Sequence, residues 1–146
     1  LVVVGRDKHL DRYADRARER GLSGRVTLAG PQADPRPYYG AADAFVLPTL
    51  YDPCPNAALE AMACALPIVT STRSGAAELA LEHDAGFACA PGDAAALAAH
   101  MRTLRDDVLR VRCGANARKA VLPLTSEAMT AKLLALYEQL LQARTD

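Results

Sequence analysis

Two acidic residues flank an expected helix start in the run YDPCPNAALE, residues 51–60. Asp52 lies in a proline-rich loop, and Glu60 follows eight positions later, inside an expected helix over 56–65. The first amides of that helix, near Asn56 and Ala57, have no intrahelical acceptor, and the positive end of the helix dipole favours phosphate. Carboxylates accept hydrogen bonds from sugar hydroxyls, as the acidic residue of dinucleotide-binding folds does from ribose. The segment therefore suits an anion with a hydroxyl-rich group on each side, which is the layout of a nucleotide sugar.

The same two acidic residues also have a structural interpretation. Asp52 could cap a turn, and Glu60 could be a solvated helix residue that balances the dipole, because both uses are common. Arg73, beside Ser74 and Gly75 in a later loop, is similarly either a phosphate ligand or a solvated turn residue. The residues alone leave these alternatives open.

Apolar runs that end at glycine or proline predict five buried strands, over residues 1–5, 25–30, 44–48, 67–71 and 86–90. Helical patterns separate and follow them, over residues 10–22, 38–42, 56–65, 76–82, 94–105, 108–120 and 127–142. We expect Asn56 and Asp93 to be helix N-caps and Gly21 to end a helix. Alternation of strands and helices predicts an α/β fold with a Rossmann-like parallel sheet, helices on both faces and a helical C-terminal end.

Ligands of open parallel sheets bind beyond the carboxyl ends of the strands. Four segments lie there: Gly5 to Lys8, Gly30 and Pro31, 48–56, and 71–75. They hold glycines, basic side chains and the helix start described above. We therefore expect the ligand site at this edge of the sheet.

Composition excludes several classes of protein. The chain has 146 residues, of which 51% are hydrophobic, and 17 basic residues balance 17 acidic ones. This balance argues against disorder and against a general nucleic-acid binder. No apolar run approaches the length of a membrane span, and the start lacks the pattern of a signal peptide, so we expect a cytoplasmic protein. We interpret the widely spaced Cys54, Cys64, Cys89 and Cys113 as ordinary thiols of a reducing compartment.

Motifs for other nucleotide chemistry are missing from the sequence. There is no G-x-G-x-x-G for a dinucleotide and no G-x-x-x-x-G-K-[ST] for a nucleoside triphosphate. There is also no D-x-D, so metal-bound diphosphate chemistry is not indicated.

The run YDPCPNAALEAMACALPIVTS resembles the signature of family 4 glycosyltransferases, whose GT-B fold has two facing Rossmann-like domains. The segments LVVVGRDK, RVTLAG, YYGAADAFVLPTLYD, TSTRSGAAEL and GFACAPGD follow the order of the C-terminal domain of that family. The likeness covers nearly the whole chain and weakens after about residue 110. A finer likeness is to bacterial glucosyltransferases of lipopolysaccharide core assembly.

The resemblance implies a role for each matching position. Asp52 and Glu60 would be the catalytic acidic pair, with Asp52 on the hydroxyls of the donor sugar and Glu60 on the ribose. The remaining donor-binding positions would be the loop of Cys54, Pro55, Asn56 and Ala57 along the sugar and diphosphate, Gly5 and Lys8 at the mouth of the first strand, Gly30 and Pro31 at the base, and Ser74 and Gly75 in the same cleft. The donor would be a nucleoside-diphosphate sugar, UDP-sugar first of all, with no metal and no other cofactor.

Two positions depart from the family pattern. Asp52 stands where a Glu is commoner, which shortens the reach of the carboxylate by one methylene. Ala65 stands where a Gly is usual, so the end of the helix must close without an easy left-handed residue.

The resemblance also implies a partner domain. We expect residues 1–146 to be a single, N-terminally truncated donor domain. The acceptor-binding N-terminal domain and a basic pair that stabilises the departing diphosphate are not in this sequence. Peripheral membrane association would belong to that absent half. The first hypothesis is therefore a retaining glycosyltransferase acting on a hydroxyl acceptor such as a glycan or lipopolysaccharide, whose donor domain alone is inactive. The alternative is a non-catalytic module that binds a nucleotide or phosphosugar.

An apolar stripe follows the last expected helix, through Leu133, Leu134, Leu136, Tyr137, Leu140 and Leu141. Such a stripe favours a core face. If it instead crosses to an absent domain, it is an exposed apolar patch in this chain.

Overall fold

The structure is a computed structural model that describes residues 1–143. The last three residues of the expected 1–146 domain lie outside the described residues. The chain divides into two compact units, an N-terminal unit (Leu1–Gly40) and a C-terminal unit from Ala41 onward. Helix α2 (Arg36–Ala41) lies across the boundary in sequence.

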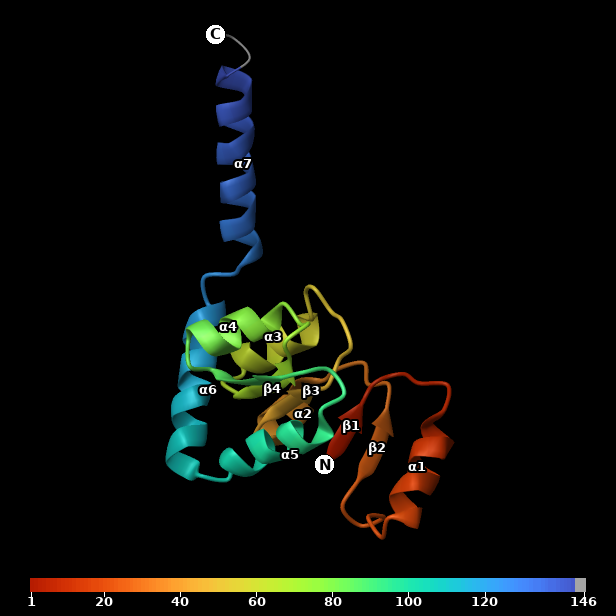
Figure 1. Cartoon of the computed structure of the whole chain (residues 1–146). Helices are drawn as coiled ribbons and strands as arrows, with labels where there is room; N and C mark the ends of the chain where they lie inside the picture. The colour runs from red at the N-terminus through yellow and green to blue at the C-terminus, as the bar shows by residue number, and fades with distance from the viewer. Residues whose placement is uncertain (144–146) are drawn as a thin grey trace. The chain divides into compact units, whose positions relative to one another are not determined.

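The N-terminal unit contains a two-stranded parallel sheet of β1 (Val2–Val4) and β2 (Thr27–Gly30). Helix α1 (Leu10–Glu19) connects them and packs beside β2 (Figure 1). Gly21 follows this helix with φ +68°, and the amide of Leu22 donates to the carbonyl of Ala17, which closes the helix end. The expected stop at Gly21 is confirmed.

The C-terminal unit is built on a three-stranded parallel sheet in the order β3-β4-β5. Its strands are β3 (Phe45–Leu47), β4 (Ile68–Ser71) and β5 (Gly86–Cys89). Every residue of the central strand β4 is buried, as its apolar run predicts for a strand paired on both edges.

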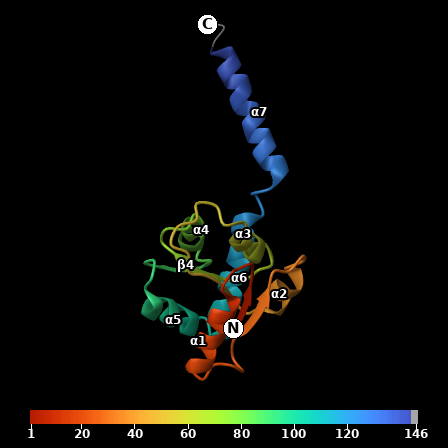
Figure 2. The same cartoon turned by 90° about the vertical axis from the view of Figure 1, so that its right-hand side faces the viewer.

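Helices cover both faces of this sheet. Helices α3 (Asn56–Ala63) and α4 (Ala76–Glu82) lie on one face, and α5 (Ala94–Thr103) lies on the other (Figures 1 and 2). Helix α6 (Asp107–Val121) packs along α3. The α/β fold with parallel strands between helices is confirmed, although the strands form two separate sheets.

Small residues let the elements of the C-terminal unit approach closely. Met62, Ile68 and Val121 share the core with a series of buried alanines. A Cβ at Gly114 of α6 would overlap the carbonyl oxygen of Ala65 at the end of α3. Glycine at 114 therefore permits the α3–α6 packing.

Helix ends correct one prediction, confirm another and show how the turn after α3 closes. Asn56 is wrong as an N-cap, because Pro55 occupies that position and Asn56 is the first helical residue. Asp93 is confirmed, since its Oδ1 accepts from the amide of Ala96 at 2.9 Å. Ala65 adopts φ +60°, so the helix end closes on a left-handed residue even though the glycine that is usual there is absent.

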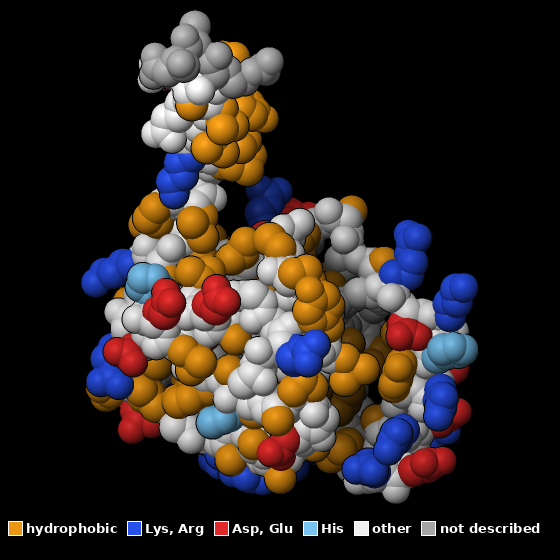
Figure 3. All heavy atoms as spheres, turned by 45° about the horizontal axis from the view of Figure 1, so that its top comes forward, with side chains coloured by type: hydrophobic (Ala, Val, Ile, Leu, Met, Phe, Trp, Pro, Cys, Tyr) orange, Lys and Arg blue, Asp and Glu red, His pale blue; other side chains and the backbone are white. Residues whose placement is uncertain are grey.

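Helix α7 (Ser126–Gln142) buries none of its residues. Its large apolar side chains, from Met129 to Leu140, are between 41% and 59% exposed. Figure 3 shows hydrophobic side chains gathered along this helix. The interpretation of the apolar stripe on this helix as a core face is wrong. The stripe is an exposed apolar patch, which was the alternative interpretation. Within residues 1–143, no helix has the length and apolarity needed to cross a membrane.

Candidate functional site

The loop that carries Asp52 is joined to the loop between β4 and α4. Asp52 and Ser74 form an isolated parallel β-bridge. The amide of Asp52 donates to the carbonyl of Arg73 at 3.2 Å, and the amide of Gly75 donates to the carbonyl of Asp52 at 2.9 Å. The structure therefore brings together Asp52, Ser74 and Gly75, which the sequence placed in two loops.

The side chain of Asp52 is half-buried at this junction. Its Oδ1 accepts from the amide of Cys54 at 3.3 Å, which is the turn-capping geometry of an aspartate. A carboxylate has room for further hydrogen bonds on its two oxygens. Asp52 thus caps its own turn, and this does not exhaust its capacity to accept bonds from a ligand.

The start of α3 differs from the starts of α5, α6 and α7. Asp93, Asp106 and Thr125 cap those three helices with side-chain oxygens. Pro55 at the start of α3 has no side-chain acceptor, and the first turn holds no acidic residue. Among the described residues, no acceptor is found for the amides of Asn56 and Ala57, and both residues are exposed. This end of α3 presents unsatisfied donors and positive dipole charge to an anion.

Glu60 lies one helical turn after Asn56, so the two share a face of α3. The residue is exposed. Cys54 is also exposed, whereas Pro55 is buried beneath the turn. The acidic residues therefore lie before and after the open end of α3, as their spacing predicts.

Ser74 has an unusual environment. Its residue is only 4% exposed, and its Oγ has no hydrogen-bond partner among the described residues. A buried hydroxyl without a partner is costly, so such a group marks either strain or a missing partner.

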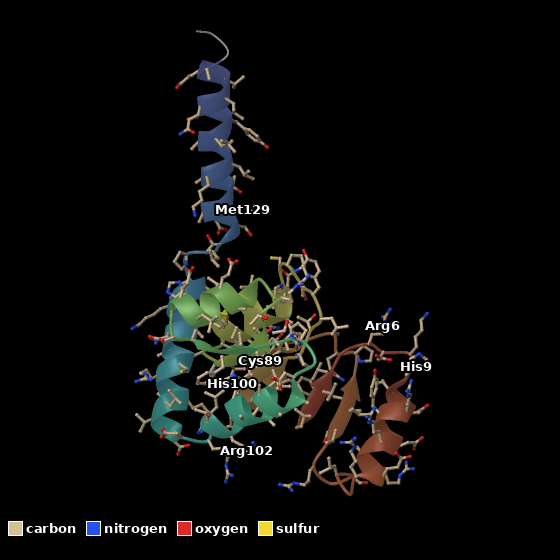
Figure 4. All side chains as sticks on the ribbon, in the orientation of Figure 1. Arg6, His9, Cys89, His100, Arg102 and Met129 are labelled. Atoms are coloured by element: carbon tan, nitrogen blue, oxygen red, sulfur yellow. The ribbon has the colours of Figure 1, made fainter. Side chains whose placement is uncertain are left out.

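Gly5, Lys8, Gly30 and Pro31 belong to the N-terminal unit. The amide of Gly5 donates to the carbonyl of Gly30 at 2.9 Å, so the ends of β1 and β2 meet. Lys8 and Pro31 are exposed in the loops that follow these strands. Figure 4 shows Arg6 and His9 in the same loop as Lys8, before α1.

A cavity of about 150 Å³ lies at the carboxyl ends of β3, β4 and β5. Thr49, Leu50, Ser71, Cys89, Pro91 and Leu97 are among the residues that line it. None of the expected site residues lines this cavity. Thr49, Leu50 and Ser71 come from the segments 48–56 and 71–75 expected at this edge of the sheet. The sequence did not predict a cavity there, because a cavity depends on how neighbouring side chains fill space.

Residues 1–107 match the family model for glycosyl transferases group 1. The chain belongs to this family. One member, the lipopolysaccharide core biosynthesis glycosyltransferase LpsE of Rhizobium meliloti, is 33% identical over 113 residues, which are 77% of this chain and 33% of that protein. This glycosyl transferase chain matches only part of each curated relative. The match covers 26% to 33% of the length of three of them.

Solved structures support the same assignment of fold. Sucrose-phosphate synthase from Thermosynechococcus elongatus superposes with a TM-score of 0.83 at 34% identity, over 98% of this chain and 39% of that one. HepE of Anabaena, solved in complex with UDP-glucose, superposes with a TM-score of 0.73 at 25% identity, over 82% of this chain and 35% of that one. The glycosyl transferase chain thus has the fold of one GT-B lobe.

One contact in this glycosyl transferase chain was not foreseen from its sequence. The guanidinium of Arg73 lies over the ring of Tyr51, 5.7 Å from its centroid. The two residues are 22 positions apart, and only the pairing of their loops brings them together. The sequence signal for this contact is the position of Tyr51, an aromatic residue directly before the candidate site residue Asp52.

Proposed function

We propose that this chain is the donor-binding domain of a retaining glycosyltransferase that moves a sugar from a nucleoside-diphosphate sugar to a hydroxyl acceptor. Asp52 accepts hydrogen bonds from hydroxyls of the donor sugar, and Glu60 accepts them from the ribose. The amides of Asn56 and Ala57 bind the diphosphate between them. Gly5, Lys8, Gly30 and Pro31 are proposed as further donor-binding residues of the N-terminal unit.

The observation that carries this proposal is the uncapped start of α3 between two acidic residues. In three other helices of the C-terminal unit a side-chain oxygen at the N-cap accepts from the amide of the third helical residue, whereas α3 and α4 have no side-chain cap. An anion that accepts from two backbone amides at a helix N-terminus is stabilised by hydrogen bonds and by the dipole together. The diphosphate of a nucleotide sugar supplies that anion, and its two sugars supply hydroxyls for the carboxylates.

Family membership supports the chemistry, and one solved relative supports the ligand. HepE was solved with UDP-glucose, which makes a UDP-sugar the first donor to test. The acceptor is proposed only as a class, a glycan or lipopolysaccharide hydroxyl, on the likeness to LpsE. Charge on the leaving diphosphate would be stabilised by amides and basic side chains, with no metal ion required.

Calorimetric titration of UDP tests the assignment. We expect UDP to bind the full chain and Glu60→Ala to lose about 1.5–3 kcal/mol of binding free energy, because a hydrogen bond to a charged group is removed. Glu138→Ala on α7 is the matched control, since it removes an exposed helical glutamate far from α3 in sequence. Equal affinity of the Glu60 variant and the wild type would refute the ribose assignment.

Two further measurements address metal and turnover. UDP affinity should be the same with magnesium and with a chelator, and a loss on chelation would contradict metal-free binding. We expect the 146-residue chain to release no UDP from UDP-glucose in the presence of glycan acceptors, whereas a longer protein containing it should. Turnover by the chain alone would show that it needs no second domain.

A further inference from the structure

Arg73 places a positive charge at the loop junction. It is exposed on the loop between β4 and α4, and its guanidinium lies over the ring of Tyr51. Within residues 1–143, no carboxylate lies at ion-pair distance from this guanidinium. The charge is therefore held in place by an aromatic ring and remains available to an anionic ligand.

The backbone of Arg73 is fixed on both sides. Its amide donates to Oγ of the buried Ser71 at 3.2 Å, and its carbonyl accepts from the amide of Asp52. The position of the Arg73 Cα is thus tied to the end of β4 and to the loop that leads into α3. Without these two backbone hydrogen bonds, the position of Arg73 relative to the Asp52 loop would not be fixed.

A positive charge at this junction offsets the repulsion between Asp52 and a bound diphosphate. A diphosphate at the start of α3 lies a few residues along the chain from the negative charge of Asp52, which repels it. The α3 dipole and amides attract the diphosphate, and the Arg73 guanidinium, which lies over the ring of the residue before Asp52, offsets the repulsion. Arginine suits this use because its planar group stacks on an aromatic ring and still offers several N–H donors to phosphate oxygens.

We propose that Arg73, positioned by the ring of Tyr51, binds the diphosphate of the donor. This inference rests on the proposed function, because it takes the nucleoside-diphosphate sugar as ligand. It resolves the two interpretations of Arg73 in favour of a phosphate ligand and makes Tyr51 a positioning residue. It also assigns a diphosphate-binding cation to this chain itself.

Titration of UDP and of uridine into Arg73 variants tests the proposal. Arg73→Ala should weaken UDP binding about tenfold at low salt and leave uridine binding unchanged, since only UDP carries the charge that the guanidinium contacts. The deficit should shrink at high salt, because screening already weakens the wild-type interaction. Arg73→Lys should lie between wild type and Arg73→Ala, because it keeps the charge and loses the planar stack. Arg102→Ala is the matched control, as this exposed arginine projects from α5 away from the sheet (Figure 4).

Tyr51 variants separate positioning from a general loss of structure. Tyr51→Phe keeps the ring face and should bind UDP as the wild type does, whereas Tyr51→Leu should weaken UDP binding about threefold. Equal UDP affinity of Tyr51→Leu and wild type would overturn the positioning role of Tyr51.

The outcomes also distinguish this inference from the proposed function. Absence of UDP binding by the wild-type chain would defeat both. Binding by the wild type that depends on Glu60 and is unchanged in Arg73→Ala would overturn this inference alone. Equal weakening of UDP and uridine in Arg73→Ala would also overturn it, because a charge contact affects only the phosphorylated ligand.

Discussion

The amide of Gly75 donates to the carbonyl of Asp52 at 2.9 Å, and this bond closes the junction of the two loops that carry the candidate site. The approach is so close that a Cβ at position 75 would overlap the carbonyl oxygen of Pro53. Glycine at 75 is therefore required by the neighbouring backbone, and the position of Asp52 depends on it.

Substituting Gly75 should consequently separate the loops. We expect Gly75→Ala to cost about 1–3 kcal/mol of stability, because the overlap is with backbone and cannot be relieved by a side-chain rotation. UDP affinity should fall as well. Urea denaturation and calorimetry measure the two effects. Gly24→Ala is the control, since a Cβ there has nothing within 4 Å, and it should be near neutral. Gly75→Ala with wild-type stability would contradict the close approach.

Ala65 offers a prediction of the opposite sign. Its φ of +60° costs an L-residue about 1–2 kcal/mol. A glycine removes this cost, but its greater freedom in the unfolded chain cancels part of the gain. Ala65→Gly should therefore stabilise the chain by about 1 kcal/mol. Ala63→Gly, two residues earlier and still helical, should destabilise it by about as much. Urea midpoints compare the pair, and a loss of stability in Ala65→Gly would show that the left-handed conformation is not the native one.

Thiol alkylation reports on the same loop without a mutation. Cys54 and Cys64 are exposed and should react first. Burial raises the pKa of Cys113, so less thiolate is present at a given pH and alkylation there should be slow. UDP should protect Cys54, which precedes the start of α3, and leave Cys64 at its end unprotected. Mass spectrometry of alkylated peptides measures each site. Equal protection of both cysteines would argue against a ligand at the start of α3.

Helix α7 should contribute little to the stability of the rest of the chain. It buries none of its residues, so a chain that ends at Leu124 should unfold at the same urea concentration as the full chain. Met62→Ala, which empties a fully buried position, should cost about 2–5 kcal/mol and shows that the assay is sensitive. Removal of the exposed apolar stripe should also reduce self-association at high concentration. A lower midpoint for the shortened chain would mean that α7 packs in solution.

Much of the fold was predictable because its signals are local. Continuous apolar runs marked the strands, and Asp93 marked a helix start, since each depends on a few neighbouring residues. The absence of glycine at position 65 was noticed for the same reason, but the left-handed conformation that Ala65 adopts there was not predicted. Asn56 failed as an N-cap because Pro55 takes that position, a choice between adjacent residues that pattern alone decides poorly.

Relationships between distant segments were harder to predict. The sequence placed Asp52 and Ser74 in loops of the same sheet edge, but their β-bridge and the stacking of Arg73 on Tyr51 require the packed loops. The stripe on α7 has the periodicity of a buried face, and periodicity does not reveal whether anything covers it. The cavity beside Cys89 and the buried hydroxyl of Ser74 likewise follow from packing.

The central claim is that the start of α3 binds the diphosphate of a nucleotide sugar. Amide chemical shifts during a UDP titration test it most directly, because they report on the backbone donors themselves. We predict the largest shifts at Asn56 and Ala57, with small shifts at Ala94 and Ala96, whose amides already donate to the carbonyl of Gly92 and to Oδ1 of Asp93. Saturable UDP binding that leaves the amides of Asn56 and Ala57 unshifted would contradict the account.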